Sequence, residues 1–303
     1  MVQNIPLIDT HQHLWDLTRL SLPWVNDLEL MNRSYLMSDY LEACANSGIE
    51  ASIYMEVDVD TILRDREIND VTKHCLSPNG FMKGMIISGS PDSVDFDDYL
   101  QRNSTNKFIK GVRCVMHVAE TPTGYCLTPE FISGVRLLGK RELVFSVCMR
   151  PSELGDAISL AEQCPETTFV LDHCGNADPY IVNGQSDLFD DSSDGVYYHS
   201  RQGWIDSISK LGSQPNVICK ISGIIARARD GWTPETLAPT IDACLDAFGA
   251  EKVVFGGDWP VCRFGAELQD WVTAYRAVLS KRDLDFQHKA MHNTAERIYG
   301  ITL

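Results

Sequence analysis

Two histidines separated by one residue, His11 and His13, follow the first apolar run of the chain. Residues two apart on a β-strand point to the same face, so both imidazoles aim at one spot where the strand gives way to a loop. Two imidazoles placed in this way can hold a divalent metal or grip a substrate directly. A His-x-His pair is a weak signal by itself, so the rest of the chain must supply its context.

Composition limits the classes of function. The chain has 303 residues, of which 44% are hydrophobic and 22% charged, as is typical of a globular protein. Its net charge of -16 disfavours nucleic acid and anionic membranes as partners. It has no apolar run of transmembrane length, no signal-peptide pattern at Met1 and no CxxC pair among ten cysteines. We therefore expect a cytoplasmic protein with reduced core thiols and a small-molecule substrate, and leave a homo-oligomer open.

Eight short apolar runs recur along the chain, and most are continuously apolar, as in strands that helices bury on both faces. They are Pro6–His11, Ala51–Val57, Gly80–Ser88, Phe108–Val115, Leu143–Cys148, Thr168–Asp172, Asn216–Ile221 and Lys252–Gly257. Helical patterns lie between them, with Thr128 and Thr233 as N-caps before prolines and Gly249 as a stop. The pattern predicts an α/β protein, a single-domain (β/α)8 TIM barrel over residues 1–303. A doubly wound sheet is the alternative, but no GxGxxG follows the first strand.

Polar side chains gather where the predicted strands end, while the strand interiors are apolar. In a (β/α)8 barrel the catalytic groups lie at the carboxyl ends of the strands, so this segregation indicates an enzyme. The residues at or just beyond those ends are His11, His13, Glu56, Arg113, His117, Arg150, His173, Lys220 and Asp258.

Several segments together carry a family resemblance. They are 9–16, 23–24, 110–113, 171–173, 219–223, 255–260 and 293–300. In this order they resemble the amidohydrolase superfamily, and more closely the amidohydrolase-related (amidohydrolase 2) family of sugar-lactone and dicarboxylate-lactone hydrolases. The resemblance implies an active site of His11, His13, His173 and Asp258. It also implies two versions of that site, one in which these four residues hold a single divalent metal, most often zinc, and one that is metal-independent.

Opening a lactone ring requires a base for water and a cation for the tetrahedral oxyanion. Asp258 is the predicted base, and Arg113 or Lys220 is the predicted contact to carbonyl or carboxylate oxygens. An ion pair with a carboxylate such as Glu56 or Asp172 is the structural alternative for both cations. Glu56 is in turn either an additional metal ligand or such a pairing partner.

Four further residues are candidates for substrate contact. Trp15 and Trp259 lie close in sequence to the histidine pair and to Asp258, respectively. They could line the pocket, or pack beneath a loop. His117 follows the fourth strand, and Arg150 precedes Pro151, where it could equally be structural. The long acidic segment 176–199 could form a lid, or a solvent-exposed loop without a role in the site.

Two other functions stay open: a zinc-dependent decarboxylase of a small carboxylic acid and a non-catalytic ligand-binding barrel.

Overall fold

The computed structural model describes residues 5–185 and 195–303. Eight parallel strands pair in chain order in one sheet. They are β1 (Leu7–Gln12), β2 (Ile49–Met55), β3 (Met82–Ser88), β4 (Ile109–Met116), β5 (Val144–Met149), β6 (Phe169–Leu171), β7 (Val217–Ile221) and β8 (Val253–Phe255). A parallel bridge between Gln12 and Trp259 brings β1 beside the end of β8. The predicted (β/α)8 barrel is therefore confirmed, and the first and last predicted strands meet.

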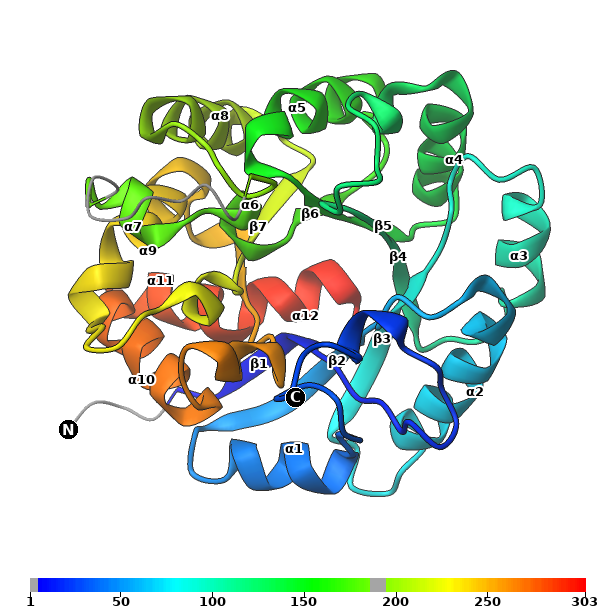
Figure 1. The fold of residues 1–303 in the computed structure, drawn as a ribbon, viewed down its shortest axis with the longest axis horizontal. Coiled ribbons are helices and arrows are strands. Elements are labelled where there is room, and N and C mark those ends of the chain that lie inside the picture. The colour runs from blue at the N-terminus through cyan, green and yellow to red at the C-terminus, as the bar shows by residue number, and fades with distance from the viewer. Residues whose placement is uncertain (1–4, 186–194) are drawn as a thin grey trace.

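Helices surround this sheet, whereas the last helix, α12, lies across one end of the barrel (Figure 1). The helices are α1 (Met37–Cys44), α2 (Arg64–Cys75), α3 (Phe96–Arg102), α4 (Pro129–Lys140), α5 (Leu154–Gln163), α6 (His173–Asn176), α7 (Pro179–Val182), α8 (Arg201–Ser213), α9 (Pro234–Phe248), α10 (Leu268–Leu279), α11 (Leu284–His288) and α12 (Thr294–Tyr299). The predicted helix starts and ends are confirmed at three places. Thr128 caps α4 by accepting a hydrogen bond from the Phe131 N–H, Thr233 precedes Pro234 at the start of α9, and Gly249 ends α9 with φ 67°.

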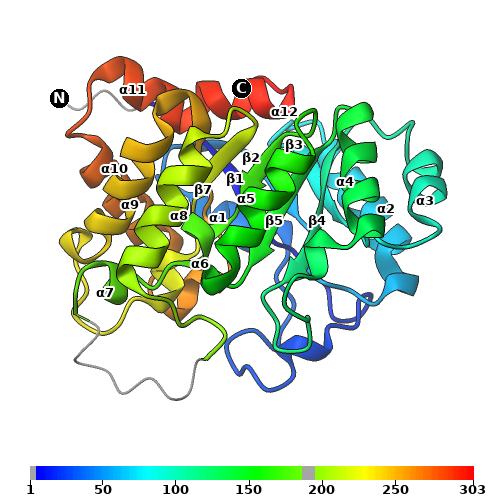
Figure 2. The same ribbon diagram turned by 90° about the horizontal axis from the view of Figure 1, so that it is seen from above.

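The two ends of the barrel differ. At the amino-terminal end, inward-facing residues such as Ile8, Ile53 and Ile218 form an apolar cluster with Tyr299 of α12. The turned view places α12 at one end of the barrel and the segment 14–37 at the other (Figure 2). The polar strand ends therefore face the loops, and apolar side chains close the opposite end.

None of the helices described has an apolar stretch long enough to cross a bilayer.

Candidate active site

Backbone strain concentrates at the carboxyl ends of three strands. Five non-glycine residues with positive φ lie there: Asp58 after β2, His173, Cys174 and Asn176 after β6, and Asp258 after β8. Their φ angles lie between 53° and 57°. Such conformations cost roughly 1–3 kcal/mol each, and they cluster at functional sites because packing must hold them in place. Two of these residues, His173 and Asp258, are predicted catalytic residues.

A buried carboxylate joins the two strands that carry the histidine pair and Asp258. Asp9 Oδ1 accepts hydrogen bonds from the His11 N–H at 2.9 Å and the Gly257 N–H at 2.7 Å. Its Oδ2 accepts from the Tyr40 hydroxyl at 2.7 Å. Burial raises the pKa of Asp9 to about 6, although these hydrogen bonds favour its ionised form. Asp9 therefore fixes the backbone on both sides of the site.

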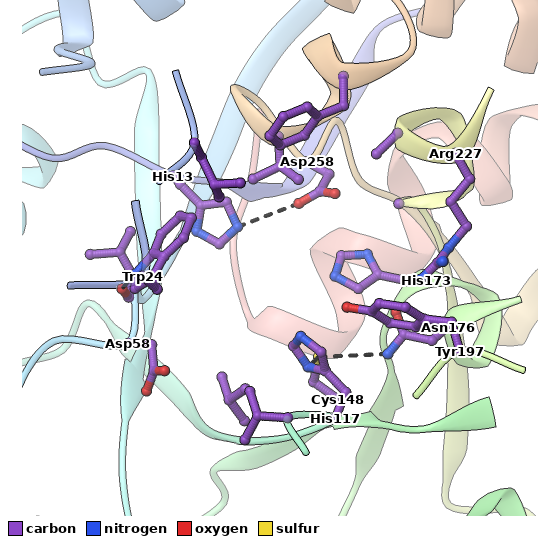
Figure 3. A pocket seen from close by; sticks show the side chains of 18 of the residues that line it. His13, Trp24, Asp58, His117, Cys148, His173, Asn176, Tyr197, Arg227 and Asp258 are labelled. Carbon is purple, nitrogen blue, oxygen red and sulfur yellow. Dashed lines mark hydrogen bonds and ion pairs between the residues drawn. The ribbon is translucent and has the colours of Figure 1, made fainter. Parts of the chain in front are cut away.

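His13 and Asp258 point toward each other at the wall of the cavity (Figure 3). The Nδ1 of His13 lies 2.9 Å from the Met55 carbonyl oxygen and 3.0 Å from that of Glu56. Carbonyl oxygens only accept, so His13 Nδ1 carries a proton, and Nε2 is the ring nitrogen that faces Asp258. The distance from this Nε2 to Asp258 Oδ1 is 3.4 Å, and from His11 Nε2 to the same oxygen it is 3.6 Å.

These three residues fit a divalent metal. One ligand atom from each of His11, His13 and Asp258 lies within 4.8 Å of the other two. Ligand atoms at about 2.0–2.1 Å from a tetrahedral zinc would be about 3.3 Å apart, close to the two distances above. The backbone carbonyls that hold His13 Nδ1 supply the outer hydrogen bond that metal-bound histidines usually make. Two imidazoles and a carboxylate form a donor set suited to zinc and similar metals.

Burial and neighbouring charges set the protonation of this cluster. Burial alone would raise the pKa of Asp258, but His173, His13 and His11 outweigh it and hold the pKa well below its usual range. Burial, reinforced by the field of Lys220, keeps the pKa of His11 well below its usual range. Asp258 is therefore ionised at neutral pH, and His11 is neutral.

Lys220 lies beneath His11 and outside the cavity lining that the described residues form, contrary to its predicted contact with substrate. Its Nζ donates to Asp172 Oδ1 at 2.8 Å and lies 3.2 Å from His11 Nδ1. Burial opposes the charge on Lys220, but the field of Asp172 outweighs it and raises the lysine pKa. A fully buried cation needs such a partner, so Lys220 reaches the site through His11.

Arg113 is placed for both of the roles that the sequence left open. Its guanidinium borders the cavity, and Nη1 lies 3.4 Å from His11 Nε2. On its other side it donates to the carboxylate and to the carbonyl oxygen of Glu56. The second oxygen of Glu56 accepts from the Asp58 N–H at 2.7 Å. Because both oxygens are engaged, the structure assigns Glu56 to the ion pair with Arg113 and not to the metal cluster.

His173 and His117 both line the cavity. The Nδ1 of His173 lies 3.0 Å from Ser222 Oγ, which orients the ring. Burial lowers the pKa of His173 and, more strongly, brings that of His117 to about 3, so both are neutral at pH 7. Both histidines therefore lie in the same cavity lining as His13 and Asp258. His173, a predicted metal ligand, is not part of the group that His11, His13 and Asp258 form.

Besides Lys220, three more predicted substrate contacts are not among the described residues that line this cavity of about 620 Å³. Trp15 is buried and packs against Trp24, and Trp259 packs against Tyr35. The guanidinium of Arg150 is occupied by Glu153 and by the carbonyl oxygens of residues 118 and 121. These three side chains support the loops around the cavity, which is the alternative that the sequence allowed for them.

The lining also includes residues to which the sequence assigned no contact with substrate, among them Trp24, Asp58, Asn176, Tyr197 and Arg227. Trp24 belongs to the long segment 14–37 and to the resemblance segment 23–24, which were the two available signals for it. Tyr197 belongs to the long segment 176–199, where loop length was the available signal. The guanidinium of Arg227 stacks on the Tyr197 ring, 3.6 Å from its centre. Within the segment 176–199 that was predicted as a lid, residues 186–194 lie outside the described part of the chain, and the described residues before them include α7.

Comparison with known proteins agrees with this architecture. An L-fucono-1,5-lactonase of Burkholderia ambifaria is 24% identical, over 87% of this chain and 83% of that protein. An amidohydrolase from Burkholderia multivorans, solved with bound zinc, has a TM-score of 0.83 at 20% identity, covering 98% of this chain and 100% of that one. A probable 2-pyrone-4,6-dicarboxylic acid hydrolase from Acinetobacter baumannii, solved with citric acid, has a TM-score of 0.72 at 15% identity, covering 97% and 99%.

The family model described as amidohydrolase matches residues 8–301. This span runs from β1, at whose end His11 and His13 lie, to Ile301 of the apolar cluster at the amino-terminal end of the barrel. With the barrel, the strand-end histidines and the eighth-strand aspartate already in place, the chain belongs to the amidohydrolase family.

Proposed function

We propose that this protein hydrolyses a small lactone by attack of water on the ester carbonyl. The observation that carries the proposal is the meeting of His11 and His13 with ionised Asp258 beside a cavity that Arg113 also lines. This arrangement supplies a base, oriented imidazoles and a cation, which are the groups that acyl transfer to water requires. The similarity to an L-fucono-1,5-lactonase supports a lactone as the substrate class.

Asp258 moves the proton in this reaction. Both of its contacts to His11 and His13 involve Oδ1, which leaves Oδ2 as the atom that takes a proton from water. The resulting hydroxide adds to the carbonyl carbon, and the ring C–O bond breaks as the tetrahedral intermediate collapses. The proton on Asp258 then passes to the leaving alkoxide. Arg113 stabilises the oxyanion, because its charge is already positioned by Glu56 and needs no reorganisation.

In the metal-dependent version, His11, His13 and Asp258 hold one divalent ion, and we propose zinc. When bound, such an ion lowers the pKa of water and polarises the carbonyl. In the metal-independent version the histidines and Arg113 polarise the carbonyl themselves. The tasks of Asp258 and Arg113 are the same in both versions, so the metal question can be tested separately from the reaction class.

Two lactone classes are compatible with the family, and the lining favours a polyhydroxylated sugar lactone. Trp24 is 37% exposed and stands beside Asp58 in the cavity wall. An aromatic face packs against the C–H surface of a sugar, and a carboxylate accepts hydrogen bonds from its hydroxyl groups. A dicarboxylate lactone would place like charge against Asp58, although Arg227 across the cavity could receive one of its carboxylates.

A substrate panel tests the proposal. Wild type and Asp258→Asn are assayed with a pH indicator on sugar 1,5-lactones, sugar 1,4-lactones and a pyrone dicarboxylate, each before and after dialysis against a chelator. Acid release by wild type and not by the variant supports lactone hydrolysis. Activity that disappears with the metal and returns with zinc supports the zinc version, and activity that survives metal removal, checked by elemental analysis, supports the other.

Two results would contradict the proposal. If no lactone is opened but carbon dioxide is released from a small carboxylic acid, the protein is a decarboxylase. If the panel lactones raise the melting temperature of wild type and of Asp258→Asn by the same amount, and neither protein turns any of them over, the barrel is a binding protein.

A further inference from the structure

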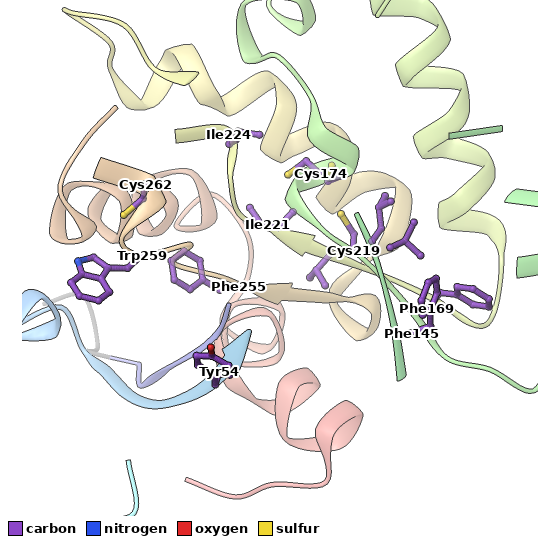
Figure 4. Packing of buried hydrophobic residues seen from close by; sticks show 14 of the residues in the cluster. Tyr54, Phe145, Phe169, Cys174, Cys219, Ile221, Ile224, Phe255, Trp259 and Cys262 are labelled. Atoms are coloured by element: carbon purple, nitrogen blue, oxygen red, sulfur yellow. The ribbon is translucent and has the colours of Figure 1, made fainter. Parts of the chain in front are cut away.

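Three cysteine side chains meet in the core directly behind the active site. Cys174 follows His173, Cys219 lies in β7 immediately before Lys220, and Cys244 lies in α9. Their three Sγ atoms lie within 4.8 Å of one another, and all three residues are fully buried. Cys174 and Cys219 lie among the packed apolar side chains that Figure 4 shows. Residues from three separate elements thus bring three thiols to one point that the proposed reaction does not use.

This thiol cluster offers sulfur and no other ligand type. Among the described residues, no histidine, aspartate or glutamate joins the three cysteines in a metal-binding group. Zinc in structural sites takes four ligands, whereas three sulfur donors suit a soft, three-coordinate centre. The cluster therefore differs in chemistry from His11, His13 and Asp258, although only one peptide bond separates Cys174 from His173.

The net charge of the occupied cluster decides which soft metal or metalloid suits it. Three thiolates around a monovalent or divalent ion leave a net negative charge, which is costly in a dry apolar core without a partner. Three thiolates around a trivalent centre are neutral. We propose that Cys174, Cys219 and Cys244 form a binding site for trivalent arsenic, or a related trivalent metalloid, in a trigonal arrangement of three sulfurs.

The binding step balances without an oxidant or reductant. Arsenous acid, As(OH)3, is a neutral molecule at pH 7, so it can enter a buried site without carrying charge into the core. Each thiol loses its proton to one hydroxyl group, an As–O bond breaks and an S–As bond forms. Three thiols and one arsenous acid give one neutral As(S)3 centre and three waters, and arsenic stays trivalent.

Occupancy of the thiol cluster should disturb the catalytic side. His173 and Cys174 both have left-handed backbone conformations, with φ 56° and 53°, so this turn is already strained. The Cys174 carbonyl is held by a hydrogen bond from the Trp204 indole at 2.9 Å. Drawing Cys174 Sγ toward the other two sulfurs would therefore shift the adjacent His173. This consequence for turnover rests on the proposed function, whereas the binding site itself does not.

Arsenic stoichiometry is the direct test. The reduced full-length protein is incubated for hours with arsenite under anaerobic conditions, freed of excess reagent, and measured by elemental analysis and intact mass. We expect one arsenic per chain, with a mass gain of one arsenic atom minus three hydrogens. Cys219→Ser and Cys244→Ser should each weaken arsenite binding by at least about tenfold. Cys164→Ser, which removes a buried cysteine outside the cluster, should bind like wild type.

A methyl-substituted arsenic reagent, CH3As(OH)2, separates a three-thiol site from a fortuitous pair. It forms only two S–As bonds, so Cys219→Ser and Cys244→Ser should still bind it after losing arsenite. Melting temperatures of the unloaded variants show that each still folds. The proposal is overturned if wild type takes up no arsenic, or if Cys164→Ser loses as much binding as the two cluster variants. Because none of these measurements uses a substrate, failure of the lactonase proposal would leave their outcome unchanged.

Discussion

The two ends of this barrel are built from the same eight strands but are stabilised by different forces. At the amino-terminal floor, Ile8, Ile53 and Ile218 pack with Tyr299 in an apolar cluster, and burial of apolar surface supplies the stability. At the carboxyl-terminal mouth, buried charges are compensated pair by pair, and strained residues such as Asp258 persist. Substitutions at the floor should therefore change the free energy of unfolding and leave the chemistry intact. Substitutions at the mouth should change the chemistry, and they should also change stability where they unpair or remove a buried titratable group.

Asp258→Asn should give the largest effect. The amide keeps the size of the carboxylate but cannot take a proton from water, and loss of a general base typically costs about 10²–10⁴-fold in rate. The loss should fall mainly on kcat, because water and not the substrate loses its partner. Steady-state kinetics on the lactone identified in the panel measure this loss. A variant with wild-type turnover, shown to be free of wild-type enzyme, would remove Asp258 from the mechanism.

Lys220→Met should destabilise the fold more than an ordinary mouth substitution. It leaves Asp172 without its partner in a fully buried site, and breaking a buried ion pair from one side costs roughly 3–5 kcal/mol. The double variant Lys220→Met/Asp172→Asn removes both charges and should recover part of the loss. Denaturant unfolding of the three proteins measures this coupling. Equal destabilisation in the single and double variants would show that the charge of Asp172 is not the cause.

Ile218→Ala tests the floor. Truncation of a buried isoleucine typically costs about 2–5 kcal/mol in unfolding free energy, since a cavity remains among its neighbours. The matched change Ile218→Val should cost only about 0.5–1.5 kcal/mol. Both should leave kcat/KM at the wild-type value, measured well below the melting temperature. A fall in kcat/KM that matches the loss of stability would mean that the two ends of the barrel are mechanically linked.

The sequence predicted more of the barrel than of the cavity wall, and the reason is physical. Strand order and the placement of His11, His13 and Asp258 follow from local patterns, because apolar runs and strand ends are visible in a linear sequence. Whether Arg150 or Lys220 faces substrate depends on which carboxylate lies across a strand or a loop, and periodicity does not carry that information. Trp24 and Arg227 reach the cavity from long loops whose paths are set by tertiary packing.

The smallest expected effect at the mouth is a dependence of stability on pH. Burial lowers the pKa of His117 to about 3 in the folded protein, against an ordinary value of about 6.5. Between these two values the unfolded chain binds a proton that the folded protein does not, so the unfolding free energy falls as the pH falls from 6.5 toward 3. One pKa unit corresponds to about 1.4 kcal/mol, so lowering the pH from 7 to 5.5 should cost about 1 kcal/mol through this group.

His117→Gln removes the titration and should flatten the stability profile over that range. His74→Gln serves as the matched control at the outer surface of α2, where the histidine pKa is lowered less. Urea unfolding at pH 7 and 5.5 measures the difference, and an unchanged profile in His117→Gln would mean that His117 takes up its proton in the folded protein as readily as in the unfolded chain.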